Sequence, residues 1–284
     1  MNEFWNSTPK EMYYFAKSKL LRYKQLEEFS QEKPCVFVLS TGRAGTQTLS
    51  ALLGISSNVQ SYHEPLPKLY CLSKIAYGET GSEMMLKALT EGFIIARRKL
   101  LNNSLRMGKG YIETSPQATF LAPVIRAVIP NVKFIHIVRE PKEVIRSAMR
   151  RKWYNGNRLD NCRIEPTSTS LVKIKWDSAT PFEKNVWLWA ETNEWILRFS
   201  EELPVDQYIR LRAEDIFSNH YDTLDAVFRF CGSKTEKPNK VRKILSKRLN
   251  FQNVGDFPVT DLWSASMQKQ FGDIAGDLAL KFGY

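Results

Sequence analysis

The chain has few of the residues that cross-link small proteins or bind metals. Its 284 residues include only four cysteines and three histidines, and no two cysteines form a CxxC pair. The wide spacing disfavours a disulfide-rich secreted scaffold, so we expect reduced cysteines in a cytoplasmic protein. The spacing typical of metal ligands is missing as well, and we therefore predict no bound metal. The cysteines are Cys35, Cys71, Cys162 and Cys231.

Long apolar runs are also missing. No segment reaches the roughly 18 apolar residues that a membrane span needs, and the charged N-terminus does not resemble a signal peptide. Residues 1–33 predict an amphipathic helical leader that packs on the domain, because Phe15, Leu20 and Leu26 recur at helical spacing. The alternative is peripheral contact with a membrane surface. The basic residues that would make this contact are Lys17, Lys19, Arg22 and Lys24.

The chain has fewer acidic residues than basic ones. Lysine and arginine number 41 against 30 aspartates and glutamates, which gives a formal charge of +11. Such an excess predicts an anionic partner, whether nucleic acid, a membrane surface or a small molecule that carries phosphate or sulfate. Nucleic acid is the less favoured class, because no helix-turn-helix, zinc or RNP signature accompanies the charge.

Short apolar runs alternate with helical patterns, which is typical of an α/β fold with a parallel sheet. We predict strands at residues 35–39, 58–62, 110–113, 132–138 and 207–211. We predict helices that begin near Thr46, Ser82, Ser115, Pro141 and Phe182. Two further helices are predicted from apolar residues between Leu224 and Cys231 and between Met267 and Phe282. Residues 153–181 lack periodicity and predict an irregular functional loop. We therefore expect one domain over residues 34–284, with a central parallel sheet flanked by helices.

The first strand is followed by a turn that is suited to bind an anion. Backbone N–H groups at the start of a helix attract negative charge, and Gly42 and Gly45 allow a ligand to approach closely. Thr46 and Thr48 add hydroxyl groups, and Arg43 adds a cation inside the turn. The segment differs from the GxxxxGK[ST] phosphate loop of nucleotide enzymes, which needs a lysine after its second glycine. The alternative is an ordinary strand–turn–helix connection.

A second arginine follows the strand at 132–138. Arg139 stands where ligands bind in open α/β sheets, outside the carboxyl end of a strand. Ser147 lies eight residues later in the next helix, and a serine hydroxyl can complete a phosphate site around an arginine. The alternative is a surface arginine paired with Glu140 or Glu143.

Together these two motifs resemble the sulfotransferase family that uses 3'-phosphoadenosine 5'-phosphosulfate (PAPS). STGRAGTQTL, at residues 40–49, resembles the 5'-phosphosulfate loop of the family, and IVREPKEVIRSAMR, at 137–150, resembles its 3'-phosphate motif. Weaker similarity extends over residues 34–284. The chain is more similar to the carbohydrate and tyrosyl-protein branch than to the cytosolic phenol and steroid branch, which carries lysine at the position of Arg43. The resemblance implies a P-loop nucleotide-hydrolase-like fold.

The resemblance also implies where PAPS binds and which product, adenosine 3',5'-bisphosphate (PAP), leaves. Arg43 would meet the charge that develops during transfer, and no metal is implied. Arg151 is a candidate for the 3'-phosphate, although its basic neighbours also suit a solvated helix end. Residues 250–263 lack the RKGxxGDW pattern of the cytosolic branch, so this segment receives no individual assignment. The implied PAPS-binding residues are Gly42, Arg43, Ala44, Gly45, Thr46, Gln47, Thr48, Arg139, Ser147 and Arg151.

The acceptor hydroxyl needs a general base. Glu64, after the strand at 58–62, is our leading candidate, because the resembling branches place a glutamate near that strand's end. His63 is the alternative, with an ordinary pKa of about 6.5, and Glu113 is a further candidate near a strand end. We expect His136, inside a strand, to be a core residue.

These features predict an enzyme that transfers a sulfuryl group from PAPS to a hydroxyl or amine acceptor. A carbohydrate or glycolipid acceptor is preferred by family analogy, with residues 66–110 and 153–181 shaping its pocket. The alternatives are a P-loop kinase-like nucleotide enzyme, a basic nucleic-acid-binding protein and a sulfotransferase-like protein that binds without catalysis. The kinase alternative is disfavoured, because the turn after the first strand lacks the lysine of the GxxxxGK[ST] loop. Because the chain shows no membrane anchor, we expect it in the cytoplasm.

Overall fold

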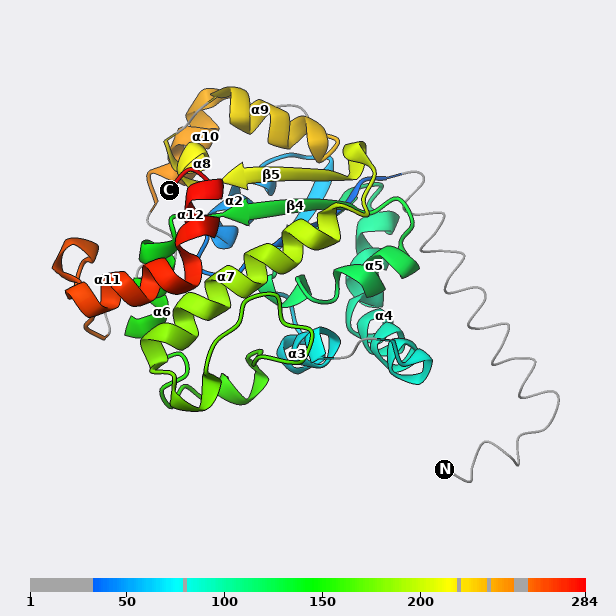
Figure 1. Ribbon diagram of the computed structural model, residues 1–284. Coiled ribbons are helices and arrows are strands. Elements are labelled where there is room, and N and C mark those ends of the chain that lie inside the picture. The colour runs from blue at the N-terminus through cyan, green and yellow to red at the C-terminus, as the bar shows by residue number, and fades with distance from the viewer. Residues whose placement is uncertain (1–32, 79–80, 219–220, 234–235, 248–254) are drawn as a thin grey trace, which may run out of the picture.

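The computed structural model describes residues 33–78, 81–218, 221–233, 236–247 and 255–284. Its centre is a five-stranded sheet in the order β2-β3-β1-β4-β5 (Figure 1), and every pair of neighbouring strands is parallel. The predicted single α/β domain and all predicted strands are confirmed. The strands are β1 (Cys35–Leu39), β2 (Val59–Tyr62), β3 (Gly110–Glu113), β4 (Lys133–Val138) and β5 (Tyr208–Arg212).

Helices cover both faces of this sheet. They are α2 (Thr46–Leu53), α3 (Tyr70–Gly78), α4 (Glu83–Arg106), α5 (Ala122–Val128), α6 (Pro141–Arg150), α7 (Pro181–Ser200), α8 (Ala213–Phe217), α9 (Tyr221–Phe230), α10 (Pro238–Leu245), α11 (Ala265–Phe271) and α12 (Asp277–Lys281). A π-helical turn at Gly272–Gly276 joins the last two. The sequence patterns missed α3, α8 and α10, each of which is short.

The helix predicted from Ser115 begins later than expected. Pro116–Ala118 forms one 3-10 turn, and α5 starts at Ala122. Pro123 is the second residue of α5 and has no N–H group, so a helix that ran through it would lose a hydrogen bond and clash with the preceding turn. The helix therefore starts immediately before this proline.

β1 is buried on both faces, as its continuous apolar sequence predicts. Phe37 and Leu39 belong to a core cluster that includes side chains of α4 and α5. Val36 and Val38 point to the opposite face and pack with residues of α2 and α9. All four side chains are fully buried. Because the strands run in parallel, their carboxyl ends meet at one edge of the sheet, where the predicted site residues lie.

The prediction of reduced cysteines is wrong for one pair. Cys71, on α3, and Cys162 form a disulfide, and their Cα atoms are 4.7 Å apart. Cys35 and Cys231 are buried free thiols. Because 91 residues separate the bonded pair, no local spacing could reveal it. The fold brings the two together by packing α3 against the 3-10 turn at Asp160–Cys162.

Two parts of the predicted domain organisation remain predictions. The leader at 1–33 lies outside the described residues except for Lys33. Residues 153–181, predicted as an irregular loop, contain single 3-10 turns at Asp160–Cys162 and Trp176–Ser178. Among the residues that the structure describes, no helix is both long enough and apolar enough to cross a membrane.

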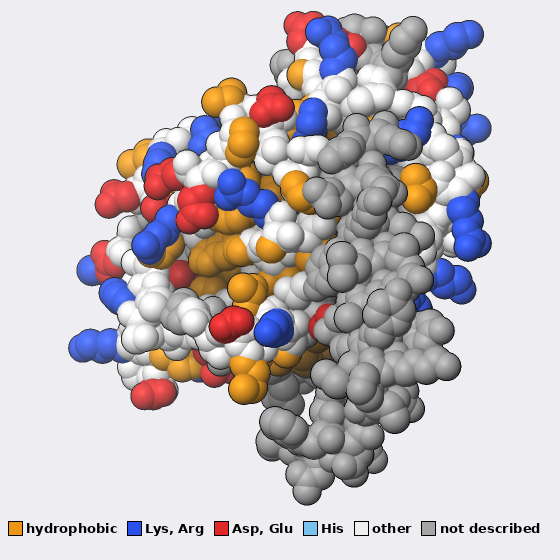
Figure 2. Space-filling view, turned by 90° about the vertical axis from the view of Figure 1, so that its right-hand side faces the viewer, with side chains coloured by type: hydrophobic (Ala, Val, Ile, Leu, Met, Phe, Trp, Pro, Cys, Tyr) orange, Lys and Arg blue, Asp and Glu red, His pale blue; other side chains and the backbone are white. Residues whose placement is uncertain are grey.

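One side of the molecule carries exposed apolar side chains. Met84, Leu86 and Ile95 on α4 are all exposed. Figure 2 views the molecule from the right-hand side of Figure 1, and hydrophobic side chains there line a hollow bordered by both positive and negative groups. The mixture of charge signs on this face differs from the carboxyl edge of the sheet, where cations surround a cleft.

His136 is a core residue, as predicted. It is fully buried in β4, where one ring nitrogen lies 2.8 Å from the amide oxygen of Asn193 and the other 3.0 Å from the Tyr208 hydroxyl. The amide oxygen can only accept, so Nε2 carries the proton and Nδ1 accepts from Tyr208. Burial lowers the pKa of His136 from its ordinary value of 6.5 to about 4.

This lowered pKa predicts that acid destabilises the fold. Between pH 6.5 and about 4, the unfolded chain binds a proton that the folded chain excludes, so stability falls as the pH falls. The loss amounts to about 3 kcal/mol over this interval. Urea unfolding of the wild type and of His136→Gln at several pH values measures it. The variant should show the weaker pH dependence, and equal slopes would contradict the assignment.

Candidate active site

A cleft of about 720 Å³ opens at the carboxyl edge of the sheet. Loops that follow four different strands line it. The turn after β1 supplies Gly42 and Arg43, the end of β2 leads to Glu64, and Gln117 and Arg139 follow β3 and β4. Ligands in open α/β sheets bind at this kind of edge. The cleft is therefore the candidate active site.

The turn after β1 has the backbone that its glycines predict. Gly42 and Gly45 have φ angles of 80° and 87°, and Arg43 between them has a φ of 58°. A Cβ atom on Gly45 would lie 2.3 Å from the ring of Phe217, so only glycine lets this ring pack on the turn. No side chain caps the first turn of α2 at Gly45, and helix N-terminal N–H groups favour anions.

Arg43 connects the two motifs. Its Nε donates to Ser147 Oγ over 2.9 Å, and Arg139 Nη1 donates to the Arg43 carbonyl over 3.1 Å. Burial, with the positive charges of Arg151 and Arg139, lowers the pKa of Arg43 to about 10, and Glu64 opposes the shift. Arg43 therefore remains charged at neutral pH, in a site that contains other cations.

The fold brings together nearly all the predicted PAPS-binding residues. Ala44 is buried and is not part of the lining. Ser147 supports Arg43 without lining the cleft itself. Arg139 also lies 3.8 Å from Glu143, which was the alternative partner. It therefore makes this ion pair and the hydrogen bond to the Arg43 carbonyl at the same time. The predicted residues that do line the cleft are Gly42, Arg43, Gly45, Thr46, Gln47, Thr48, Arg139 and Arg151.

Glu64 is held at the cleft by three donors. Its Oε2 accepts from Lys68 Nζ at 3.0 Å, Tyr70 Oη at 3.2 Å and Gln117 Nε2 at 3.4 Å. The other oxygen, Oε1, lies 4.0 Å from His63 Nε2. One carboxylate oxygen is thus anchored by neighbours, and the second faces the imidazole.

His63 has a defined tautomer. Its Nδ1 lies 2.9 Å from the backbone carbonyl of Thr114, which can only accept, so Nδ1 carries the proton. In the neutral ring, Nε2 then has a free lone pair on the side of Glu64. Burial is the main cause that lowers the pKa of His63, and Glu64 opposes it. The imidazole is therefore neutral at pH 7.

Glu113, the third candidate base, is part of the core. It is fully buried and does not line the cleft. Its carboxylate accepts from Arg97 at 2.6 and 2.9 Å and from the Tyr111 hydroxyl at 2.6 Å. Arg97 is fully buried too, and it also donates to the Pro67 carbonyl. This network joins α4 and β3 to the segment that follows Glu64.

Sequence reasoning missed several residues of the cleft. Gln117 lies just beyond β3. The rule that ligands bind beyond the carboxyl ends of strands, which predicted Arg139, could therefore have predicted Gln117 as well. Tyr70 belongs to α3, which no sequence pattern predicted, and Phe217 belongs to the equally unpredicted α8. Gly255, in the segment left unassigned, lines the cleft and accepts from Arg150 Nε at 2.9 Å. Within the described ranges, no group of three or more His, Cys, Asp or Glu side chains could hold a metal ion.

Comparison with known proteins agrees with this geometry. A family model described as "Sulfotransferase family" matches residues 34–237. The chain belongs to the sulfotransferase family. No curated protein matches its sequence. The sulfotransferase is therefore placed by its family model, its motifs and its fold.

Two solved structures are similar in fold at low sequence identity. The sulfotransferase domain of the Synechococcus PCC 7002 olefin synthase is 17% identical, with 89% of this chain and 95% of that chain covered and a TM-score of 0.53. Mouse sulfotransferase SULT7A1, solved in complex with PAP, is 14% identical, with 92% of each chain covered and a TM-score of 0.50. Both likenesses show that the sulfotransferase has the fold of its family.

The two glutamates should respond differently to removal of their charge. Glu113→Gln leaves Arg97 buried without a counter-ion and should cost about 3–5 kcal/mol of unfolding free energy. Glu64→Gln should cost less than about 1 kcal/mol, because its partner Lys68 is exposed. Urea denaturation of both variants measures the contrast, and equal losses would refute the structural role of Glu113.

Proposed function

We propose that this sulfotransferase transfers the sulfuryl group of PAPS to a hydroxyl group of a carbohydrate or glycolipid. The observation that carries the proposal is the contact between two motifs that lie far apart in the sequence. Arg43 bonds Ser147, and Arg139 bonds the Arg43 carbonyl, so the turn after β1 and the end of β4 form one anion site. A nucleotide with phosphate groups at both its 3' and 5' positions suits such a site.

The charges of the cleft support this donor. Arg43, Arg139 and Arg151 all line it, and arginine recognises phosphate and sulfate oxygens through paired hydrogen bonds. We assign the turn after β1 to the 5'-phosphosulfate and Arg139 to the 3'-phosphate, with Ser147 supporting the site through its hydrogen bond from Arg43. The PAP bound to mouse SULT7A1, a protein of the same fold, supports the same donor here.

The reaction needs positioning, charge stabilisation and one proton acceptor. The acceptor oxygen forms a bond to sulfur while the bond from sulfur to the 5'-phosphate oxygen breaks, and PAP leaves with the bonding electrons. Arg43 and the backbone N–H groups of the turn stabilise the negative charge that grows on the leaving oxygen and on the sulfuryl oxygens. The hydroxyl proton passes to a base on the enzyme.

Glu64 is the base that we favour. Tyr70, Gln117 and Lys68 anchor its Oε2, so the carboxylate is oriented while Oε1 can take up a proton. His63 is the second candidate, because burial keeps its ring neutral and Nε2 lies on the same side, 4.0 Å from Glu64 Oε1. Replacement of Glu64 and replacement of His63 should therefore have different effects on kcat.

The apolar part of the lining supports an acceptor with both apolar and polar faces. Tyr70, Phe120 and Leu159 line the cleft among polar side chains. Sugar rings present C–H faces to aromatic side chains and hydroxyl groups to polar ones. We further propose that the enzyme acts in the cytoplasm.

PAP should bind the wild type and raise its melting temperature. Arg139→Ala should weaken PAP by at least about thirtyfold, because a charged partner of the ligand is lost. Calorimetric titration measures both affinities. Arg98→Ala is the matched control, because Arg98 is exposed on α4 and does not line the cleft. Stabilisation by ATP and magnesium without stabilisation by PAP would refute the proposed donor.

Glu64→Gln should retain PAP affinity and lower kcat by about a hundredfold or more, as expected for loss of a general base. Transfer of labelled sulfate to desulfated chondroitin oligosaccharides, lactosylceramide and a tyrosine peptide provides the assay. His63→Gln should reduce kcat much less. The reverse order of the two variants would assign the base to His63.

A further inference from the structure

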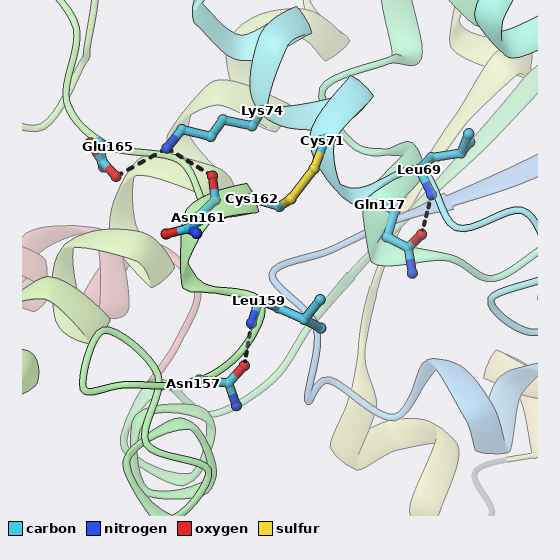
Figure 3. The surroundings of a disulfide bond; sticks show 9 residues. All are labelled: Leu69, Cys71, Lys74, Gln117, Asn157, Leu159, Asn161, Cys162 and Glu165. Atoms are coloured by element: carbon cyan, nitrogen blue, oxygen red, sulfur yellow. Dashed lines mark hydrogen bonds and ion pairs between the residues drawn. A yellow bond between two sulfur atoms is a disulfide. The ribbon is translucent and has the colours of Figure 1, made fainter.

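The disulfide joins the start of α3 to the 3-10 turn at Asp160–Cys162 (Figure 3). Cys162 belongs to the lining, and Cys71 follows Tyr70 at the start of α3. Tyr70 donates to Glu64, and Lys74 on the same helix also lines the cleft. On the proposed function, this wall of the cleft faces the acceptor, because Arg43 follows β1 and Arg139 follows β4, away from α3 and Cys162. The bond therefore joins two segments of the acceptor wall.

The segment that carries Cys162 is a compact unit. We call residues 153–163 the bridged loop. Asp160 holds it together by accepting from the backbone N–H groups of Tyr154 at 3.0 Å and Asn157 at 2.8 Å and from Arg163 Nε at 2.9 Å. Because these bonds stay within the loop, they keep its shape without attaching it to α3.

The two ends of the bridged loop are held by contacts other than the disulfide. The Trp153 carbonyl accepts from Asn185 on α7 at 3.0 Å. Ile164, just beyond the loop, is buried in a cluster with Trp187 and Leu188 of α7, a cluster that also contains Tyr77 of α3. The middle of the loop is thus the part whose position depends on the disulfide.

Few other described contacts join the middle of the loop to α3. Lys74 Nζ donates to the Asn161 carbonyl at 3.2 Å and to Glu165 at 3.0 Å (Figure 3). The Lys74 and Glu165 side chains are 32% and 49% exposed, and exposed ion pairs contribute little. The covalent bond is therefore the strongest link between the two segments.

The disulfide is also accessible. Cys71 is exposed and Cys162 is half-buried, whereas Cys35 and Cys231 are fully buried, and burial raises the pKa of both thiols. A thiol reagent from solution can therefore reach the bonded pair far more readily than the two free cysteines.

We propose that Cys71 and Cys162 form a reversible redox site that controls the acceptor side of the cleft. In the disulfide form, the bridged loop is fixed against α3 and the acceptor wall is closed. In the dithiol form, the middle of the loop separates from α3, and acceptor binding weakens. Donor binding changes little, because Trp153, the loop residue that packs beside Gly42, lies at the end of the loop that Asn185 of α7 holds.

Thiol exchange with a dithiol opens the bond, and the same exchange in reverse with a disulfide oxidant, which is itself reduced to two thiols, closes it. In the opening direction, a thiolate of the dithiol attacks the sulfur of Cys71, the more exposed residue of the pair, and Cys162 leaves as a thiolate and takes up a proton. The second thiol of the reductant then releases Cys71, so two electrons and two protons pass to the protein and the reductant becomes a disulfide. In the cytoplasm, disulfides are typically transient and redox-sensing, which fits a reversible bond in the proposed location.

Hydrogen exchange and thiol counting test this site without an acceptor. The oxidised full-length protein should yield two thiols in denaturant and the dithiothreitol-reduced protein four, because the sequence has four cysteines. Amide exchange at residues 157–163 should rise by about tenfold or more on reduction. Exchange at residues 42–48 and the PAP affinity should change by less than about threefold.

The double variant Cys71→Ser with Cys162→Ser is the control. Its loop should exchange at the reduced rate both with and without dithiothreitol. On the acceptor panel, its KM should match that of the reduced wild type, at least about fivefold above the oxidised value. Four thiols after treatment with oxidised glutathione, or equal loop exchange in both redox states, would overturn the redox site. If PAP binds neither form, the proposed donor is refuted. The redox proposal is still tested in that case, because the thiol counts and the exchange rates do not depend on PAP.

Discussion

The active site depends on holding like charges close together. Arg43 and Arg139 lie in one cleft, and burial with the neighbouring cations lowers the pKa of Arg43 to about 10 without discharging it. Ser147 and the Arg43 carbonyl hold the two guanidinium groups in place against the repulsion between their like charges. Such a site gains most from a ligand that carries several negative charges, since each charge also relieves the repulsion between the arginines. The same repulsion makes neutral ligands poor competitors.

The parallel sheet makes this arrangement possible. Arg43 follows β1 and Arg139 follows β4, and these strands are neighbours in the sheet. Their loops therefore emerge side by side although 96 residues separate the two arginines. β3 flanks β1 on its other side and pairs with β2, which brings Glu64 and Gln117 to the same edge. The donor site and the candidate base are consequences of strand order.

That Arg43 and Arg139 lie at the cleft could be predicted because the signals around them are local. A buried strand, a glycine turn and a helix start are contiguous around Arg43, and Arg139 follows an equally clear strand. The acceptor half has no such signals. Tyr70 and Cys71 lie on a helix with no predicted pattern, and Cys162 meets Cys71 only through packing of segments 91 residues apart. Glu113 shows the limit of the strand-end rule, because the rule cannot distinguish a side chain in the cleft from one that pairs with a buried arginine.

The two halves also differ in what holds them. The half proposed to bind the donor follows directly from strands of the sheet, which helices cover on both faces. The bridged loop is attached at one end to α7 and at the other lies beside a cluster that α7 shares with α3, and its middle depends on one covalent bond and on the contacts of Lys74. A change in that single bond can therefore alter acceptor binding while donor binding persists. An enzyme with this division can keep PAPS bound in either redox state and respond to oxidation through the acceptor alone. Control of activity through the donor site would require a change in the contacts of Arg43 and Arg139, and these contacts connect the loops that follow two neighbouring strands.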